Sequence, residues 1–224
     1  MKKQIHIPID NKEQMHISID NNVVCGITGL NYKFQQYLEK NPGCSVDDVT
    51  LEKLYPDKYP DENHKKTLSN LLLVLKLSLK KIIRIVILPT VLDEIFDGRI
   101  NLRDNKPNKF FLDNCVEHVI FTERQKMLID ELTKKLLEPK FYNGKKQAPF
   151  DGNHNKNHDH DARIFAESIF RGTSLMTFDN DFKNKKLIHE VVKKFEQKYP
   201  EEAKGISQFR ILTPKKHAPR DYSK

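Results

Sequence analysis

Four acidic residues stand at or just after segments whose pattern predicts a strand. Asp20 follows the alternating segment 15–19, and Asp179 follows the apolar segment 174–178. Glu94 lies one turn into a helix expected after the β-branched segment 82–88, and Asp161 opens a further helix. Functional groups of an open parallel sheet gather at the carboxyl ends of its strands. We therefore expect these four carboxylates to face one edge of a sheet.

Carboxylates that converge repel one another, and their pKa values rise unless a cation neutralises them. Mg²⁺ and Mn²⁺ suit such a site, because hard cations take carboxylate and water oxygens and leave room for a substrate phosphate. The four acids thus predict a metal site that hydrolyses phosphodiester bonds. For any single acid the alternative is helix capping, since Asp161 and Asp179 both precede helical segments. Asp10, which ends the similar segment 5–10, is a rival first acid; Asp20 is preferred because an amphipathic helix follows it directly.

The periodicity of apolar residues predicts the elements that position these acids. Strands are expected at 15–20, 82–88, 174–178 and 209–213, whereas 110–121 is ambiguous between helix and strand. Helices are expected at about 23–40, 45–54, 68–79, 90–96, 122–138, 161–171 and 185–195, with Thr90 and Thr122 as caps and a long loop at 139–158. Strands separated by helices predict an α/β fold with a mainly parallel sheet flanked by helices.

Composition limits the class of protein. The chain has 224 residues, 39 Lys and Arg against 31 Asp and Glu, and a net charge of +8. No segment has the uncharged apolar length of a membrane-spanning helix, so we expect no membrane partner. The positive charge favours a nucleic-acid partner, with ordinary lysine solvation as the alternative. The three cysteines, Cys25, Cys44 and Cys115, match no metal-ligand spacing and predict reduced thiols in a cytoplasmic protein.

Segments 15–24, 87–96, 160–182 and 209–214 resemble, in order, the signatures of PIN-domain nucleases. The resemblance implies an α/β three-layer sandwich and an acidic metal site that cleaves single-stranded or structured RNA. It assigns catalysis and metal binding to Asp20, Glu94, Asp161 and Asp179, a further metal ligand to Asp181, and supporting polar roles to Asn22 and Thr177. Asn21 departs from the family, which usually has Thr or Ser there. The long separations between the acids imply an elaborated domain at 1–214, with a helical insertion at about 40–80 and a basic tail at 215–224.

Basic and aromatic residues around these segments are candidates for contact with nucleic acid. The predicted phosphate contacts are Lys81, Arg84, Lys145, Lys146, Lys156 and Lys183. Phe141, Tyr142 and Phe150 are expected either to stack on bases or to anchor the long loop to the core. The histidines His154, His158 and His160 leave open a zinc site, although a solvated loop is preferred.

The acids and the resemblance together predict a metal-dependent endoribonuclease that uses Mg²⁺ or Mn²⁺, with RNA favoured over DNA as the substrate. Two alternatives remain: a non-catalytic RNA-binding or scaffold protein on the same fold, and a metal-dependent phosphatase. An inhibitory protein partner and a homodimer also remain open.

Overall fold

A parallel sheet forms the centre of the molecule. The computed structural model describes residues 15–56, 62–96, 116–142, 145–150, 158–178 and 184–212. The sheet consists of β1 (Met15–Ile19), β2 (Ile83–Ile87), β3 (Val116–His118), β6 (Ser174–Met176) and β7 (Ile211–Leu212). Its strand order is β3-β2-β1-β6-β7, and every neighbouring pair is parallel. The predicted α/β class with a parallel sheet is confirmed.

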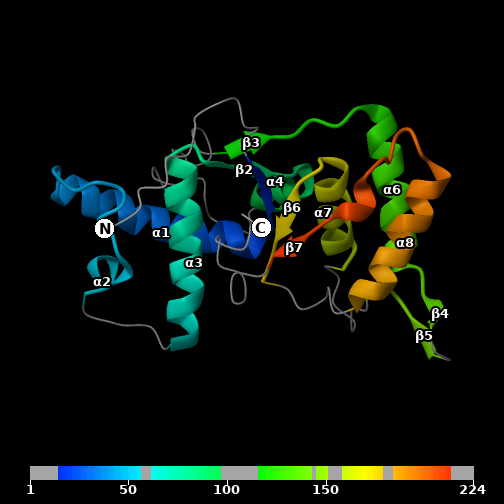
Figure 1. The fold of residues 1–224 in the computed structure, drawn as a ribbon, viewed down its shortest axis with the longest axis horizontal. Helices are drawn as coiled ribbons and strands as arrows, with labels where there is room; N and C mark the ends of the chain where they lie inside the picture. Colours follow the sequence, from blue (N-terminus) through cyan, green and yellow to red (C-terminus); the bar gives the residue numbers. More distant parts are fainter. Residues whose placement is uncertain are drawn as a thin grey trace, which may run out of the picture.

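Helices cover both sides of this sheet. They are α1 (Asn21–Lys40), α2 (Leu51–Leu54), α3 (Glu62–Leu79), α4 (Pro89–Phe96), α6 (Glu123–Leu137), α7 (His158–Phe170) and α8 (Lys185–Lys198). Figure 1 shows α1 and α3 on one side of the sheet and α7 on the other, with α6 and α8 beyond α7. Among the described residues, no helix combines the length and apolarity that crossing a membrane requires.

The central strand β1 is buried on both faces, with Ile17 and Ile19 on one face and the fully buried Ser18 on the other. Ile17 and Ile19 are almost fully buried. Ile17 pairs with Ile85 of β2 and with Ser174 of β6, so β1 has a partner on each side. Strands that are buried on both faces are typical of parallel sheets covered by helices. The alternation of residues 15–20 predicts a half-buried strand, whereas the structure buries β1 on both faces.

Two glycines near the sheet allow a turn at the end of one helix and a close approach between two others. Gly172 has a φ of +73°, in the left-handed region that favours glycine, and it ends α7 before β6 begins. Gly26 lets α1 approach α3, because a Cβ at this position would lie 2.8 Å from Leu71 Cδ1. The helix α3 lies in the predicted insertion, and Leu71 belongs to the same core cluster as the sheet residues.

Several local predictions need correction. Helix α7 begins at His158 rather than at Asp161. Thr90 lies inside α4 rather than capping it, because its backbone N–H and hydroxyl both donate to a side chain of α7. The turn bonded between Ser45 and Asp48 precedes a helix that starts only at Leu51.

Part of the predicted long loop is also ordered secondary structure. Strands β4 (Lys140–Tyr142) and β5 (Lys145–Gln147) pair antiparallel as a separate two-stranded sheet. Phe150, which follows this hairpin, is buried, and its ring centroid lies 5.7 Å from that of Phe165 on α7. Phe150 thus anchors this segment to the core, the second of the two roles predicted for it.

Candidate functional site

The strand order locates the candidate site before any side chain is considered. From β1 the chain proceeds to β2 and β3 on one side, and β6 and β7 add to the other side of β1. The order therefore reverses between β1 and β6. Ligands of open α/β sheets bind outside the carboxyl ends of the strands at such a reversal. Asp20 follows β1 and Thr177 follows β6, so both lie at this point.

Asp20 is held in place by its own backbone and by the first turn of α1. Its backbone N–H donates to the carbonyl of Met176 across the sheet at 3.1 Å. Its Oδ1 accepts from the backbone N–H of Val23 at 2.8 Å, which makes Asp20 the N-cap of α1. The residue is 5% exposed. Asp20 therefore presents a buried, oriented carboxylate at the switch point of the sheet.

The residues after Asp20 differ in their environment. Asn21, where the sequence departs from the PIN pattern, has a buried Oδ1 that lacks a hydrogen-bond partner among the described residues. Asn22 is exposed on the first turn of α1. The supporting role predicted for Asn22 stays a prediction.

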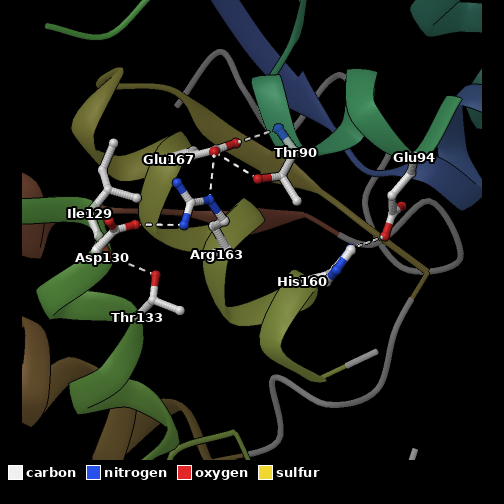
Figure 2. A network of polar contacts seen from close by, with 8 residues as sticks. All are labelled: Thr90, Glu94, Ile129, Asp130, Thr133, His160, Arg163 and Glu167. Carbon is white, nitrogen blue, oxygen red and sulfur yellow. Dashed lines mark hydrogen bonds and ion pairs between the residues drawn. The ribbon is translucent and has the colours of Figure 1, made fainter. Parts of the chain in front are cut away.

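Glu94 and His160 form a direct pair between α4 and α7. The distance from His160 Nδ1 to Glu94 Oε1 is 2.8 Å, and the dashed line in Figure 2 marks this contact. The Glu94 side chain is 9% exposed and the His160 side chain 38%. Sequence reasoning had placed His160 in a histidine-rich loop; instead it lies on the first turn of α7 and contacts one of the predicted catalytic acids.

Asp161 is the neighbour of His160 and also lies on the first turn of α7, partly buried. Because α7 leads through Gly172 into the start of β6, its first turn points toward the carboxyl edge of the sheet. Thr177 is 1% exposed, and its backbone N–H donates to the carbonyl of Leu212 at 2.9 Å. Asp20, Glu94 and Asp161 thus belong to three separate segments whose helices begin at the carboxyl edge of the sheet.

The fourth acid cannot be placed in the same way. Asp179 and Asp181 lie outside the described residues, as does the rival first acid Asp10. Within the described part of the chain, no group of three or more His, Cys, Asp and Glu could hold a metal ion. The donors that are described at this edge are mostly carboxylate oxygens, which are the ligands that hard divalent cations take.

A buried network behind the acids was not predicted. Glu167 on α7 is 2% exposed, and its two oxygens accept from the Thr90 hydroxyl at 2.7 Å and from the Thr90 backbone N–H at 3.1 Å. Arg163 Nε donates to Glu167 at 3.3 Å, and its Nη1 donates to Asp130 of α6 at 2.6 Å. Figure 2 shows how Arg163 lies between the two carboxylates.

The electrostatics of this network oppose ionisation of Glu167. Burial raises the pKa of the Glu167 carboxyl, although its hydrogen bonds from Thr90 and the charge of Arg163 partly offset the effect. One signal in the sequence pointed to this residue. Glu167 lies among the apolar residues of α7, and a carboxylate on a buried helical face requires a partner.

The predicted phosphate contacts are spread over different parts of the molecule. Lys81 precedes β2 and Arg84 is its second residue, so both lie toward the amino edge of the sheet, opposite the acids. Arg84 Nε also pairs with Glu117 at 3.3 Å. The structure therefore does not bring these two cations to the acids. Lys145 and Lys146 lie on β5, where only the backbone is described, and Lys156 and Lys183 lie outside the described residues.

Comparisons of the chain with protein-family models, with curated proteins and with solved structures find no match. The resemblance to PIN-domain nucleases therefore rests on the four sequence segments.

Proposed function

We propose that this chain is a divalent-metal-dependent nuclease with a PIN-like fold that cleaves RNA internally. One observation carries the proposal: acids from three distant segments lie at the carboxyl edge of a parallel sheet whose strand order reverses there. A single acid at a strand end is common. Three acids from segments that begin at the carboxyl edge, where such sheets bind their ligands, support a shared chemical task.

The described residues that would hold the metal are Asp20, Glu94 and Asp161. The resemblance adds Asp179 and Asp181. A bound Mg²⁺ or Mn²⁺ would supply an activated water and would stabilise charge on the phosphodiester. Asp20 suits the role because capping α1 fixes the direction of its carboxylate. Glu94 suits it because its carboxylate is buried and therefore has little orientational freedom left to lose when it binds the metal.

The net charge of +8 supports a nucleic-acid substrate. Lys and Arg that neutralise phosphates release counterions, which strengthens binding without reading sequence. An acidic centre in a basic chain would need metal to accept a polyanion, because carboxylates alone repel phosphate. The proposal therefore requires that binding and cleavage of RNA respond differently to removal of the metal.

The test is cleavage of end-labelled single-stranded RNA, structured RNA and single-stranded DNA with Mn²⁺, with Mg²⁺ and with a chelator. The variants are Asp20→Asn and Asp161→Asn, with Asp93→Asn as the matched control on the exposed face of α4. Asn is also a good N-cap, so Asp20→Asn should fold normally. We expect each site variant to lose about a hundredfold in cleavage rate and Asp93→Asn to retain the rate of the wild type.

Three outcomes contradict the proposal. Cleavage that survives both Asn substitutions shows that these acids are not the catalytic site. Salt-sensitive RNA binding by the wild type without cleavage in any metal identifies the non-catalytic RNA-binding alternative. Hydrolysis of p-nitrophenyl phosphate without cleavage of RNA identifies the phosphatase alternative.

A further inference from the structure

Helices α4 and α7 are joined by two polar contacts that fix their relative position. Thr90 contacts Glu167, and Glu94 contacts His160. The two α4 residues are four positions apart and the two α7 residues seven apart, so each pair lies on one face of its helix. The first residue of the α4 pair meets the second of the α7 pair, which means that the helices run antiparallel where they touch. Figure 2 shows both contacts side by side.

The contact between His160 and Glu94 indicates which ring nitrogen of His160 carries the proton. An ionised carboxylate only accepts hydrogen bonds, so with Glu94 ionised the donor in this contact is Nδ1 of His160. In a neutral imidazole the proton then sits on Nδ1, and Nε2 is the second, unprotonated nitrogen. The contact therefore selects one tautomer of His160 and at the same time fixes one oxygen of Glu94.

Glu94 needs such support more than Asp20 does. Asp20 is oriented by a backbone N–H three residues away in its own helix. Glu94 has a longer side chain on an eight-residue helix, and its carboxylate contacts a histidine 66 residues further along the chain. A glutamate rotamer is set by what it touches, because three side-chain torsions can otherwise change.

We propose that His160 is a positioning residue, whose Nδ1–H holds the Glu94 carboxylate in the orientation that the metal and the substrate require. This inference rests on the proposed nuclease function, in which Glu94 is a catalytic acid. His160 acts through Glu94 and itself contacts neither metal nor phosphate. The resemblance to PIN-domain nucleases assigns no role to this histidine.

The test replaces His160 with Asn or Gln, because the amide nitrogen of each side chain takes the place of one of the two imidazole nitrogens. The side-chain nitrogen of Asn is bonded to Cγ, as Nδ1 is, whereas that of Gln is one bond further out, as Nε2 is. His160→Asn therefore keeps the donor to Glu94, and His160→Gln copies the other nitrogen. His160→Ala removes both. The side chain of His160 is 38% exposed, so all three variants should fold, which circular dichroism and thermal unfolding would check.

Two measurements are made on each full-length variant: Mn²⁺ affinity by electron paramagnetic resonance, and kcat and KM for RNA cleavage. We expect His160→Ala and His160→Gln to lose about 10- to 100-fold in Mn²⁺ affinity or kcat. His160→Asn should stay near the wild type, and KM should change little in all three. Rescue by Asn alone would support positioning through Nδ1.

Other results overturn the inference. Activity retained by Gln and lost by Asn would mean that His160 contacts metal or substrate through Nε2. Wild-type values in His160→Ala would mean that the contact has no role. A wild-type protein that neither binds Mn²⁺ nor cleaves RNA would refute the proposed function, and the positioning role would fall with it.

A spectroscopic measurement distinguishes a failure of the positioning role from a failure of the proposed function. Long-range ¹H–¹⁵N spectra of the histidine rings report which nitrogen carries the proton. We expect the Nδ1–H tautomer at His160 in the wild type and a loss of that preference in Glu94→Ala, which removes the acceptor. Absence of the Nδ1–H tautomer in the wild type would overturn the inference whatever the enzymatic activity proves to be.

Discussion

Glu167 allows the sharpest test of the buried network, because its charge and its hydrogen bonds can be removed separately. Glu167→Gln removes the charge and keeps a side chain of the same shape. Glu167→Ala removes the side chain and leaves the backbone N–H and hydroxyl of Thr90 without their acceptor. The two variants should therefore change the free energy of unfolding in different ways.

The magnitude of the alanine effect follows from the contacts. Thr90 is 6% exposed, and each buried polar group that loses its partner costs about 1–3 kcal/mol. Arg163 is 39% exposed and keeps its contact with Asp130, so its charge adds little. We expect Glu167→Ala to lower the free energy of unfolding by about 2–4 kcal/mol at pH 7. Glu167→Gln should stay within about 1 kcal/mol of the wild type, because the amide oxygen still accepts one bond from Thr90.

The pH dependence gives a second, independent prediction. Burial raises the pKa of Glu167 above its usual value of 4.5, so the folded state binds this proton more tightly than the unfolded state. The contribution of Glu167 to stability is therefore fully present below pH 4.5 and is lost as the pH rises through the folded-state pKa. Glu167→Gln lacks this loss, so its stability relative to the wild type should increase as the pH is raised from 4.5.

The assay is urea unfolding followed by circular dichroism between pH 4.5 and pH 8 for the wild type and both variants. The slopes of the unfolding free energy against urea concentration should agree between proteins, so that midpoints can be compared. Parallel pH profiles for the wild type and Glu167→Gln would refute the reasoning about the charge. An alanine effect below about 1 kcal/mol would refute the reasoning about the Thr90 contacts.

Two further predictions concern local packing and capping, and both are measured by thermal or urea unfolding. Gly26→Ala places a Cβ 2.8 Å from Leu71 and should destabilise the contact between α1 and α3 by about 1–3 kcal/mol. The matched control Gly29→Ala meets nothing within 4 Å and should stabilise α1 by about 0.5–1 kcal/mol; equal effects at both glycines would contradict this account. Thr122→Ala removes the N-cap of α6, which is bonded reciprocally to Gln125, and should cost about 1 kcal/mol, whereas Thr122→Ser should cost little.

The sequence predicts those parts of the fold that depend on local pattern. The β-branched run that forms β2 predicts a buried strand, the alternation of β1 predicts a half-buried strand, and Thr122 predicts the start of α6. Strand β3 was ambiguous because it has only three residues, too few to show a period. The hairpin of β4 and β5 lay in a segment expected to be a loop, since neither strand exceeds three residues.

In the candidate site, too, residues held by local contacts could be predicted and residues held by distant contacts could not. Asp20 is positioned by a contact three residues away, so its sequence neighbours are enough to indicate where it lies. The partners of Glu94 and Thr90 come from α7, 66 and 77 residues further along the chain. Local periodicity shows which helical face is apolar, but it does not show which residue of another helix meets a polar group on that face. His160 and Glu167 were therefore missed.

Asp20 is held by a contact close in sequence and Glu94 by a distant one, so the two acids should respond differently to mutation. Substitutions in the contact between α4 and α7 should disturb Glu94 while leaving Asp20 in place, because Asp20 depends on β6 and on its own helix. Glu167 lies two helical turns from His160, yet Glu167→Ala removes one of the two polar contacts that join α4 to α7. If both acids bind the same metal, this variant should weaken Mn²⁺ binding without changing the environment of Asp20, which the Val23 amide resonance would report. A shift of that resonance as large as the one in Asp20→Asn would show that the two acids are not held independently.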